Sequence, residues 1–547
     1  MSIAIEQLPD NVDALRTIIA EQLTLIAEQQ SIITEKLDLI AEQKNEIIIL
    51  GERVKLLQSE IFGRRSEKWN GESEVQGLIF NEMEQYAAVE PDAASEETAN
   101  DDGAVKKSRR PRRAGRKPKE EALPEWLPRE NVYHELPEEE MGARRFIKWE
   151  IRESLVVERP EIRVLREHFG VYAPAEGVDI EGEPDVKTAP RPPRLLERSI
   201  ASAALLAHVI ISKFCDGIPL YRQEGMVARW EINISRQSMS NWGLRAASRC
   251  ERLVELLEGE ELVAGPHIAS DETEVQVLNE PNRGNTNKSY MWVLRGGTRD
   301  GPVVRFKYRE SHSASFLNEL LAGYRGTLLT DGLKSYDVVA GSLNIVHAGC
   351  WDHVRRPFRD VLKAGKSEAA EQALHLIGRL YRVERYGRRL DLSPEQILEL
   401  RRRKSKPVVD EFREWLDCMA ISTAPKSLLG RAIAYALGQW SKLIVFLNDG
   451  NVPISNIAVE NAIRPFVIGR KAWLFAGSPR GAKASAIFYT LIETAKANGL
   501  DPYWYLRYLF ERLPYAENDQ DLKALLPTRL KMDTIRTFFK PDENQAS

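Results

Sequence analysis

HIASDETEVQVL (267–278), SYMWVLRGG (289–297) and PVVRFKY (302–308) are three apolar runs that decide the fold of this chain. They are rich in β-branched and aromatic residues, and short segments containing Gly, Asn and Asp separate them. Runs of this kind between turn residues predict β-strands. We therefore expect three consecutive strands between residues 267 and 308.

Four further elements are expected directly after these strands. They are a helix in SASFLNELLAGY (313–324), a strand in GTLLTDG (326–332), a helix in KSYDVVAGS (334–342) and a strand in NIVHAGC (344–350). Three strands, a helix, a strand, a helix and a strand is the element order of a ribonuclease H-like fold. In that fold the first and fourth strands bring two acidic residues side by side.

Three carboxylates lie where catalytic acids would be useful. Asp271 is on the first expected strand, Asp331 ends the fourth, and Glu460 is on an expected helix within NIAVENAIRPFVIGRKAWLFAGS (456–478). Carboxylates are hard ligands that suit Mg²⁺ or Mn²⁺, and two such ions about 4 Å apart can clamp both oxygens of a phosphoryl transfer. The alternative is that these acids, three among 81 acidic residues, are turn formers or helix caps.

Length and composition limit the other possibilities. The chain has 547 residues, enough for several domains, and its net charge of −4 means that any nucleic-acid surface must be local. Its four cysteines are widely spaced with no CxxC pair, so neither a disulfide framework nor a cysteine zinc site is expected. The N-terminus does not resemble a signal peptide, and the longest apolar stretch (200–211) is too short to span a bilayer. We expect a cytoplasmic protein without membrane contact.

A heptad repeat occupies the first part of the chain. One position of the repeat is β-branched throughout, at Val12, Ile19, Ile26, Ile33, Ile40, Ile47, Val54 and Ile61. A strict period of seven predicts a left-handed coiled coil, which we place at residues 1–66 and expect to form a homo-oligomer. Gln22, Gln29, Lys36 and Gln43 interrupt the apolar seam, so the oligomeric state stays open. The alternative is a long helix that packs on its own protein.

Residues 67–125 are expected to form a linker with separated charge blocks. Residues 72–102 contain ten acidic residues and no basic one, and KKSRRPRRAGRKPK (106–119) contains nine basic residues and no acidic one. Basic residues of this block are candidates for contacts in a DNA minor groove: Arg109, Arg110, Arg112, Arg113, Arg116 and Lys117. The alternative is a solvated tail that contacts its own acidic block.

The remaining regions have weaker patterns. Residues 126–190 contain short strand-like runs, and residues 191–260 are helical in pattern. In the latter region a helix, a short turn and a second helix place Arg236 and Gln237 at the start of a potential DNA-recognition helix. The alternative is a three-helix packing element. Residues 501–547 are expected to form a C-terminal helical tail.

Several separated blocks resemble the insertion sequence 66 family of transposases. The catalytic blocks that carry the resemblance are SDETEV (270–275), TDGLKSY (330–336), CWDHVRRPF (350–358), NIAVENAIRP (456–465) and GRKAWLFAGS (469–478). Three flanking blocks agree as well, namely IFGRRSEK (61–68), SKFCDGIPLYRQE (212–224) and YTLIETAKANGLDPYWYL (489–506). The resemblance therefore covers nearly the whole chain.

This resemblance implies a DNA transposase with a ribonuclease H-like catalytic domain at 261–354 and 451–500, and a helical insertion at 355–450. It implies an Asp-Asp-Glu triad, which by position is Asp271, Asp331 and Glu460, holding two Mg²⁺ or Mn²⁺ ions. The expected partners are double-stranded DNA, both element ends and target, and accessory proteins of the same element. Two other readings stay open: a nuclease of this fold without strand transfer, and a non-catalytic DNA-binding protein.

Two positions depart from the family pattern. Family members usually carry a zinc-binding segment with CxxC pairs after the phrase HELPEEE, but here residues 134–140 continue as MGARRF without cysteine. We therefore expect residues 126–190 to form a degenerate, zinc-ribbon-like segment without zinc. Asn461 stands where an arginine commonly follows the catalytic glutamate.

Further DNA contacts are expected around the triad. The candidates are His353, Arg355, Arg356, Arg464, Arg470 and Lys471. Alternatively, Arg464 pairs with Glu460, four residues earlier on the same helix face. Cys350 and His353 form a CxxH motif, but two ligands are too few for a closed zinc site. The alternative for this motif is a packed cysteine beside a surface histidine.

Overall fold

The computed structural model describes residues 11–62, 162, 164–169, 171–172, 187–188, 190–313 and 315–539. The chain divides into two compact units, residues 1–64 with 192–547 and residues 65–191. In the second unit, strands β1 (Val171–Tyr172) and β2 (Lys187–Thr188) form an antiparallel pair. The predicted linker 67–125, its basic block and most of the predicted segment 126–190 lie outside the described residues.

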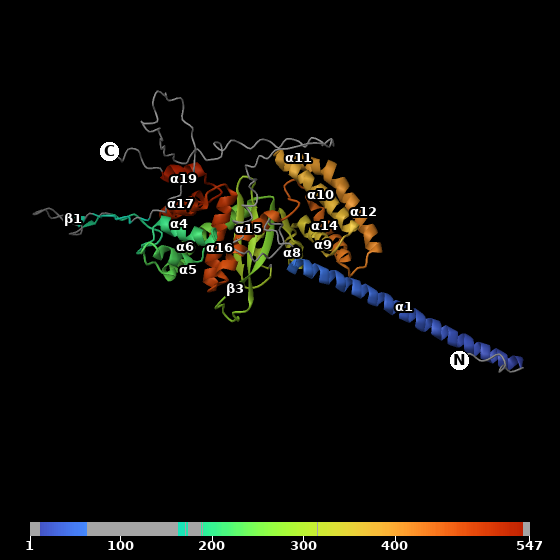
Figure 1. Ribbon diagram of the computed structural model, residues 1–547. Coiled ribbons are helices and arrows are strands. Elements are labelled where there is room, and N and C mark those ends of the chain that lie inside the picture. The colour runs from blue at the N-terminus through green and yellow to red at the C-terminus, as the bar shows by residue number, and fades with distance from the viewer. Residues whose placement is uncertain are drawn as a thin grey trace, which may run out of the picture. The chain divides into compact units, whose positions relative to one another are not determined.

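A mixed sheet forms the centre of the first unit (Figure 1). Its main strands are β3 (His267–Val277), β4 (Lys288–Gly297), β5 (Pro302–Arg309), β6 (Thr327–Thr330) and β7 (Val346–Gly349). They lie in the order β5-β4-β3-β6-β7, in which β3, β4 and β5 are antiparallel neighbours and β3, β6 and β7 are parallel neighbours. The short strand β8 (Phe475–Ala476) pairs in parallel with the end of β3.

The predicted element order for residues 267–350 is confirmed. Helix α7 (Phe316–Leu320) precedes β6, and α8 (Lys334–Leu343) connects β6 to β7. Helix α7 is shorter than the predicted helix at 313–324, because the chain leaves the helix and turns through Gly323 with a φ of +79°. Next to this turn, the Tyr324 hydroxyl donates to the Gly265 carbonyl (3.1 Å) and fixes the start of β6 beside that of β3.

Helices cover both faces of the sheet. Helix α15 (Ile457–Trp473) packs on β3 and β4. On the other face, the Tyr336 hydroxyl of α8 lies 3.1 Å from the Ser270 hydroxyl of β3. Successive side chains of a strand point to opposite faces, so Ser270 faces α8 while Asp271 faces α15.

Helix α16 (Pro479–Ala497) lies along the outer edge of β5. Thr490 Oγ1 accepts from Phe306 N–H (3.0 Å), and Thr494 Oγ1 accepts from Val304 N–H (3.1 Å). The match in spacing is geometric, because four helical residues rise about 6 Å and two strand residues rise about 6.8 Å. The threonines thus satisfy buried backbone groups that an edge strand otherwise exposes.

We expect Thr490→Val and Thr494→Val each to lower the free energy of unfolding by about 1–3 kcal/mol, because each leaves a buried N–H group without an acceptor. Valine keeps the size and branching of the side chain, so packing changes little. Urea unfolding followed by circular dichroism measures the effect. Thr286→Val, at an exposed threonine, is the control, and equal small losses in all three variants would contradict the role of the two hydroxyls.

A group of helices lies between β7 and α15 in the chain. It comprises α9 (Trp351–Ala364), α10 (Glu368–Arg389), α11 (Pro394–Leu400), α12 (Lys406–Ser422), α13 (Leu428–Gly438) and α14 (Trp440–Leu443). Their shared core is aromatic, since Trp351 lies within 5.8 Å of Phe412 and 6.4 Å of Trp440 between ring centroids. Trp351 Nε1 also donates to the Leu443 carbonyl (3.0 Å). These contacts hold the start of α9 rigidly against α12 and α14.

Helices before and after these elements complete the first unit. Helices α4 (Ala203–Phe214), α5 (Leu220–Ala228) and α6 (Arg236–Leu256) precede the sheet. The last helices are α17 (Pro502–Arg512), α18 (Asp519–Ala524) and α19 (Met532–Phe539), and α17 packs against α4. Among the residues that the structure describes, no helix combines the length and the apolar character needed to cross a membrane.

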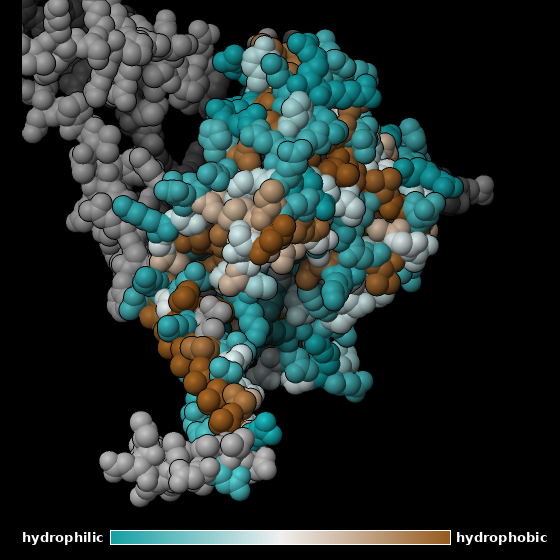
Figure 2. Space-filling view, turned by 90° about the vertical axis from the view of Figure 1, so that its right-hand side faces the viewer, coloured by the Kyte–Doolittle hydropathy of each residue, from teal (hydrophilic) through white to brown (hydrophobic). Residues whose placement is uncertain are grey.

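The N-terminal heptad region is one continuous helix, α1 (Val12–Phe62). Near its end, Glu52 accepts from the Leu428 N–H group (3.1 Å). Most of its apolar stripe is exposed within the single chain; Ile33 and Ile47, for example, are 57% and 68% exposed. Figure 2 shows hydrophobic residues along this helix.

Candidate active site

Parallel pairing of β3 and β6 brings Asp271 and Asp331 together. The register pairs His267 with Thr327 and Ala269 with Leu329. Asp271 and Asp331 each follow this last pair by two residues, so an extension of the register would place them opposite each other. Asp271 therefore lies within β3 and Asp331 directly after β6, on two neighbouring strands of the sheet.

Glu460 reaches the same face of the sheet from the first turn of α15. Asp271 and Thr273 point to one face of β3, and Arg470 Nη1 of α15 donates to Thr273 Oγ1 (3.2 Å). This bond fixes the C-terminal half of α15 on the face that carries Asp271. Glu460 and Asp331 both lie near enough to Asp271 for their charges to raise its pKa.

The three acids form a centre with an excess of negative charge. Burial is the largest cause that raises the pKa of Asp271 to about 8. The charges of Glu272, Glu460 and Asp331 act in the same direction, and the Glu272 N–H that donates to Asp271 Oδ1 (3.0 Å) opposes them. A divalent cation would remove this repulsion, and the all-oxygen donor set fits a hard ion such as Mg²⁺ or Mn²⁺.

The loop that carries Asp331 is held by hydrogen bonds. Asp331 Oδ1 accepts from Leu333 N–H (3.2 Å), and the Tyr435 hydroxyl of α13 donates to the Asp331 carbonyl (2.8 Å). Gly332 has a φ of +96°, and a Cβ there would lie 3.0 Å from the Gln439 side chain. The loop therefore needs glycine at this position, and α13 with the residue that follows it shapes the loop.

A hydrogen-bonded histidine, His347, supports β6 just before Asp331. His347 Nε2 lies 2.9 Å from Thr330 Oγ1, and His347 Nδ1 lies 2.8 Å from Asp337 Oδ1. Lys442 in turn pairs with Asp337 (2.6 Å). This chain of contacts joins the end of β6 to β7, α8 and α14.

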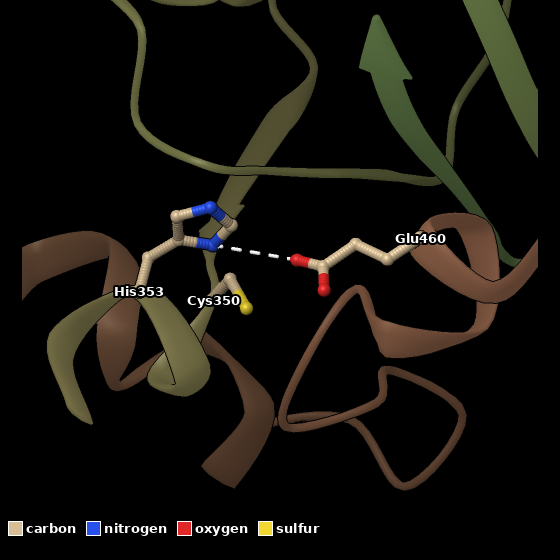
Figure 3. A group of neighbouring side chains, drawn as sticks. All are labelled: Cys350, His353 and Glu460. Atoms are coloured by element: carbon tan, nitrogen blue, oxygen red, sulfur yellow. Dashed lines mark ion pairs between the residues drawn. The ribbon is translucent and has the colours of Figure 1, made fainter. Parts of the chain in front are cut away.

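Glu460 has a second set of neighbours on α9 (Figure 3). Its Oε1 lies 3.8 Å from His353 Nδ1. Donor atoms of Cys350, His353 and Glu460 all lie within 4.8 Å of one another. His353, which the sequence predicts as a DNA contact, is therefore a direct neighbour of the third acid.

The predicted basic residues lie around this centre in different settings. Burial lowers the pKa of Arg464, while the charge of Glu460 opposes that change, so the two side chains interact. Arg355 Nη1 lies 4.0 Å from Asp352 Oδ1, and Arg470 donates to Thr273 as described above. Lys471 is exposed near the end of α15. Burial raises the pKa of Tyr435 to about 12, and the charge of Arg356 opposes this rise.

Arg236 and Gln237 lie apart from the acidic centre, at the exposed start of α6. The Ser235 hydroxyl accepts from Ser238 N–H (3.1 Å) and caps this helix. The Arg236 N–H donates to Glu224 Oε1 (3.0 Å), which ties the start of α6 to the preceding helix α5. The predicted helix, short turn and helix are therefore present, with both side chains at the surface.

Sequence reasoning did not find Tyr435 and Gln439 as neighbours of Asp331. Tyr435 is 104 positions further along the chain, and its helix has an ordinary apolar pattern. No local motif marks either residue. Cys350 was noticed through the CxxH motif, but its closeness to Glu460 depends on the tertiary fold.

Comparisons with known proteins match several segments of this chain to transposase families. The family described as "Transposase IS66 family" matches residues 198–484, and "IS66 C-terminal element" matches residues 490–528. A further family, "Transposase C of IS166 homeodomain", matches residues 49–132.

Two similar proteins come from Sinorhizobium fredii (strain NBRC 101917 / NGR234). Uncharacterized protein y4qI is 31% identical over 563 residues, which cover 98% of this chain and 100% of that protein. Uncharacterized protein y4jD is 31% identical over 369 residues, which cover 64% of this chain and 71% of that protein.

Proposed function

Since the chain belongs to the IS66 family of transposases, we propose that it cleaves DNA at the ends of an insertion element and joins those ends to target DNA. The convergence of Asp271, Asp331 and Glu460 on one face of the sheet carries this proposal. Hydrolysis and transfer of a phosphodiester by divalent ions needs such a cluster of carboxylates, and nothing in the scheme requires a covalent protein intermediate.

The architecture around these acids supports a ribonuclease H-like catalytic domain. The first three strands are antiparallel, and the fourth and fifth add in parallel beside the first. The first of these strands carries Asp271, and Asp331 directly follows the fourth. The helices from α9 to α14 then form an insertion before the helix that carries the third acid.

We assign the following roles to the acidic residues. Asp271 would bind both of two Mg²⁺ or Mn²⁺ ions, Asp331 one of them and Glu460 the other. When bound, such ions lower the pKa of a water or a 3′-hydroxyl and stabilise the leaving oxygen of an in-line displacement. Tyr435 and Leu333 hold Asp331 in place for this task, and Asp271 is half-buried.

Basic residues beside the acids would bind the DNA backbone. Candidates around the centre are His353, Arg355, Arg356, Arg464, Arg470 and Lys471. Guanidinium groups bind phosphate oxygens with two parallel hydrogen bonds, and the electrostatic interaction of Arg464 with Glu460 supports a role for Arg464 beside the acids. Arg236 and Gln237 at the start of α6 would contact element-end DNA separately.

The test of the proposed function is a strand-transfer assay. Purified full-length protein is incubated with a labelled element-end duplex, a target plasmid and Mg²⁺. We expect metal-dependent cleavage followed by joined products. Cleavage without joining would instead indicate a nuclease of the same fold, and DNA binding without any cleavage, also after addition of the accessory proteins of the same element, would contradict an enzymatic function.

The basic block at 106–119 is proposed to bind DNA in addition to the catalytic domain. This block lies within the match to a homeodomain-type family at 49–132, and homeodomain arms insert arginines into the minor groove. Deletion of 106–119 is expected to weaken DNA binding and to lower the salt dependence by about 0.9 log unit per lost phosphate contact. Fluorescence anisotropy at several salt concentrations measures this slope. A slope equal to that of the full chain would contradict the contact.

Helix α1 is proposed to form a coiled coil with a second copy of this chain. Its exposed β-branched stripe repeats every seven residues, and burying such a stripe stabilises a left-handed coiled coil. Removal of residues 1–62 is expected to convert the oligomer to a monomer in sedimentation velocity experiments. An Ile33→Asn, Ile40→Asn double substitution tests the same seam without deletion. An unchanged sedimentation coefficient in both variants would contradict the proposal.

A further inference from the structure

A mixed set of sulfur, nitrogen and oxygen donors lies directly beside the proposed Mg²⁺ centre. Cys350, His353 and Glu460 point toward one another, with their donor atoms all within 4.8 Å (Figure 3). We propose that these three side chains bind Zn²⁺ or a similar transition metal, and that this binding withdraws Glu460 from Asp271 and Asp331. The metal site itself stands on geometry, whereas its inhibitory effect rests on the proposed transposase function.

The backbone positions the sulfur and the nitrogen of this site. Cys350 is the N-cap residue of α9 and His353 is in its first turn, so the two side chains emerge from the same end of the helix. The start of α9 is fixed, because Trp351 N–H donates to the Ile454 carbonyl (3.1 Å) and its indole N–H donates to the Leu443 carbonyl (3.0 Å). A metal would therefore meet two ligands whose backbone is already ordered.

The surroundings of Cys350 favour a negatively charged sulfur once a cation is present. Asn456 N–H donates to Cys350 Sγ (3.4 Å), and the positive end of the α9 dipole lies at the same position. Burial alone works against ionisation and raises the pKa of this thiol to about 12. Without a metal, the residue is thus a buried neutral thiol.

The separations suit a tetrahedral ion after a small adjustment. Zn²⁺ binds sulfur at about 2.3 Å and nitrogen or oxygen at about 2.0–2.2 Å, so tetrahedral ligands stand roughly 3.3–3.8 Å apart. His353 Nδ1 and Glu460 Oε1 are already 3.8 Å apart. Glu460 has rotatable side-chain bonds that can close the remaining distance to the sulfur. The fourth position would hold water, as in zinc sites with three protein ligands.

The donor atoms of this site also favour a different metal ion from those of the all-carboxylate centre. Thiolate and imidazole ligands select Zn²⁺ and related ions, whereas carboxylates alone suit Mg²⁺ and Mn²⁺. On binding, the Sγ–H bond of Cys350 breaks, an Sγ–Zn bond forms and the proton passes to solvent. No electron is transferred and no other reactant is required.

Glu460 belongs to both sites, so a metal bound beside Cys350 and His353 would affect the Mg²⁺ centre. A carboxylate drawn toward Cys350 and His353 is no longer free to complete the set with Asp271 and Asp331. Zn²⁺ would then lower Mg²⁺-dependent DNA cleavage, and the transposase would be sensitive to the concentration of free transition metal.

Binding is tested with Co²⁺, a spectroscopic substitute for Zn²⁺, added to the full-length protein without DNA. We expect one equivalent to produce the near-ultraviolet charge-transfer absorption of a Co²⁺–thiolate bond, and Zn²⁺ to remove it. Cys350→Ser and His353→Gln should each weaken Co²⁺ binding by at least about tenfold, and Cys350→Ser should also abolish the thiolate band. Cys418→Ser, at an exposed cysteine, should behave as the wild type. A band that persists in Cys350→Ser, or no band in the wild type, would overturn the proposal.

Inhibition is measured as the ratio of cleavage rates with and without Zn²⁺ at constant Mg²⁺, within each variant. The Zn²⁺ concentration that halves cleavage is expected to rise at least about tenfold in Cys350→Ser, and not in Cys418→Ser. Equal inhibition of both variants would show that Zn²⁺ acts elsewhere. A wild-type protein that binds Co²⁺ through Cys350 but never cleaves DNA, also after addition of the accessory proteins of the same element, would refute the proposed function and leave the metal site intact.

Discussion

Glu460→Gln is expected to lower the rate of Mg²⁺-dependent cleavage of an element-end duplex by at least about a thousandfold, which corresponds to about 4 kcal/mol of lost transition-state stabilisation. Glutamine keeps the length and shape of the side chain but removes the charge that would hold a divalent ion. Asp271→Asn and Asp331→Asn should have effects of similar size, because the three carboxylates would act as one unit. DNA affinity should change little, since the acids do not contact phosphate directly.

Glu274→Gln is the matched control for this series. Glu274 lies on the same strand as Asp271, but it is exposed and pairs with Lys288 at the surface (2.7 Å). Its substitution should leave cleavage unchanged. Wild-type cleavage by Glu460→Gln would show that the acid assignment is wrong, and loss of cleavage in Glu274→Gln would point to a general defect in folding.

Much of the central sheet was predictable because its strands have strong local patterns. The apolar runs that form β3, β4 and β5 are long and bounded by turn residues. After them, helices and strands alternate in the order α7, β6, α8 and β7. Asp271 and Asp331 could be placed at strand positions from these patterns alone. Their closeness then follows from the parallel register of β3 and β6.

Other features depend on contacts between distant parts of the chain. Asp331 and Tyr435 are 104 positions apart, and no periodic pattern in the sequence links the two residues. The closeness of Glu460 to Cys350 and His353 was not predictable for the same reason, since the CxxH motif lies at the start of α9 and Glu460 lies on α15. Likewise, the pairing of Thr490 and Thr494 with β5 depends on the position of α16 at the edge of the sheet.

Tertiary contacts also explain why helix propensity predicted too long a helix at residues 313–324. SASFLNELLAGY has a helical composition, but only Phe316–Leu320 is helical. Gly323 adopts a positive φ, and Tyr324 is directed to the Gly265 carbonyl to start β6. Tertiary contacts at the start of a buried strand thus override a weak local preference.

Asp271→Asn is expected to stabilise the metal-free protein, and to do so increasingly as the pH rises. In the folded state burial and neighbouring carboxylates raise the pKa of Asp271 to about 8, whereas in the unfolded chain it is about 3.9. Below pH 4 both states hold the proton, and the variant should match the wild type. Between pH 4 and 8 only the unfolded wild type ionises, so the wild type loses stability, and above pH 8 the loss is complete. Asparagine does not ionise and avoids this loss.

The size of this effect is large for a single substitution, because each tenfold difference in proton affinity corresponds to about 1.4 kcal/mol. Urea unfolding in EDTA at pH 5, 7 and 8.5 measures the difference between variant and wild type, with Asp300→Asn, at an exposed aspartate, as the control. Mg²⁺ should then stabilise the wild type and narrow the gap, since it replaces the proton at Asp271, and it should stabilise Asp271→Asn far less. The interpretation would be wrong if the difference in unfolding free energy between variant and wild type did not depend on pH. It would also be wrong if Mg²⁺ stabilised both proteins equally. A loss of cleavage together with a gain of stability would instead mark Asp271 as a residue whose charge destabilises the empty fold and serves only the bound ion.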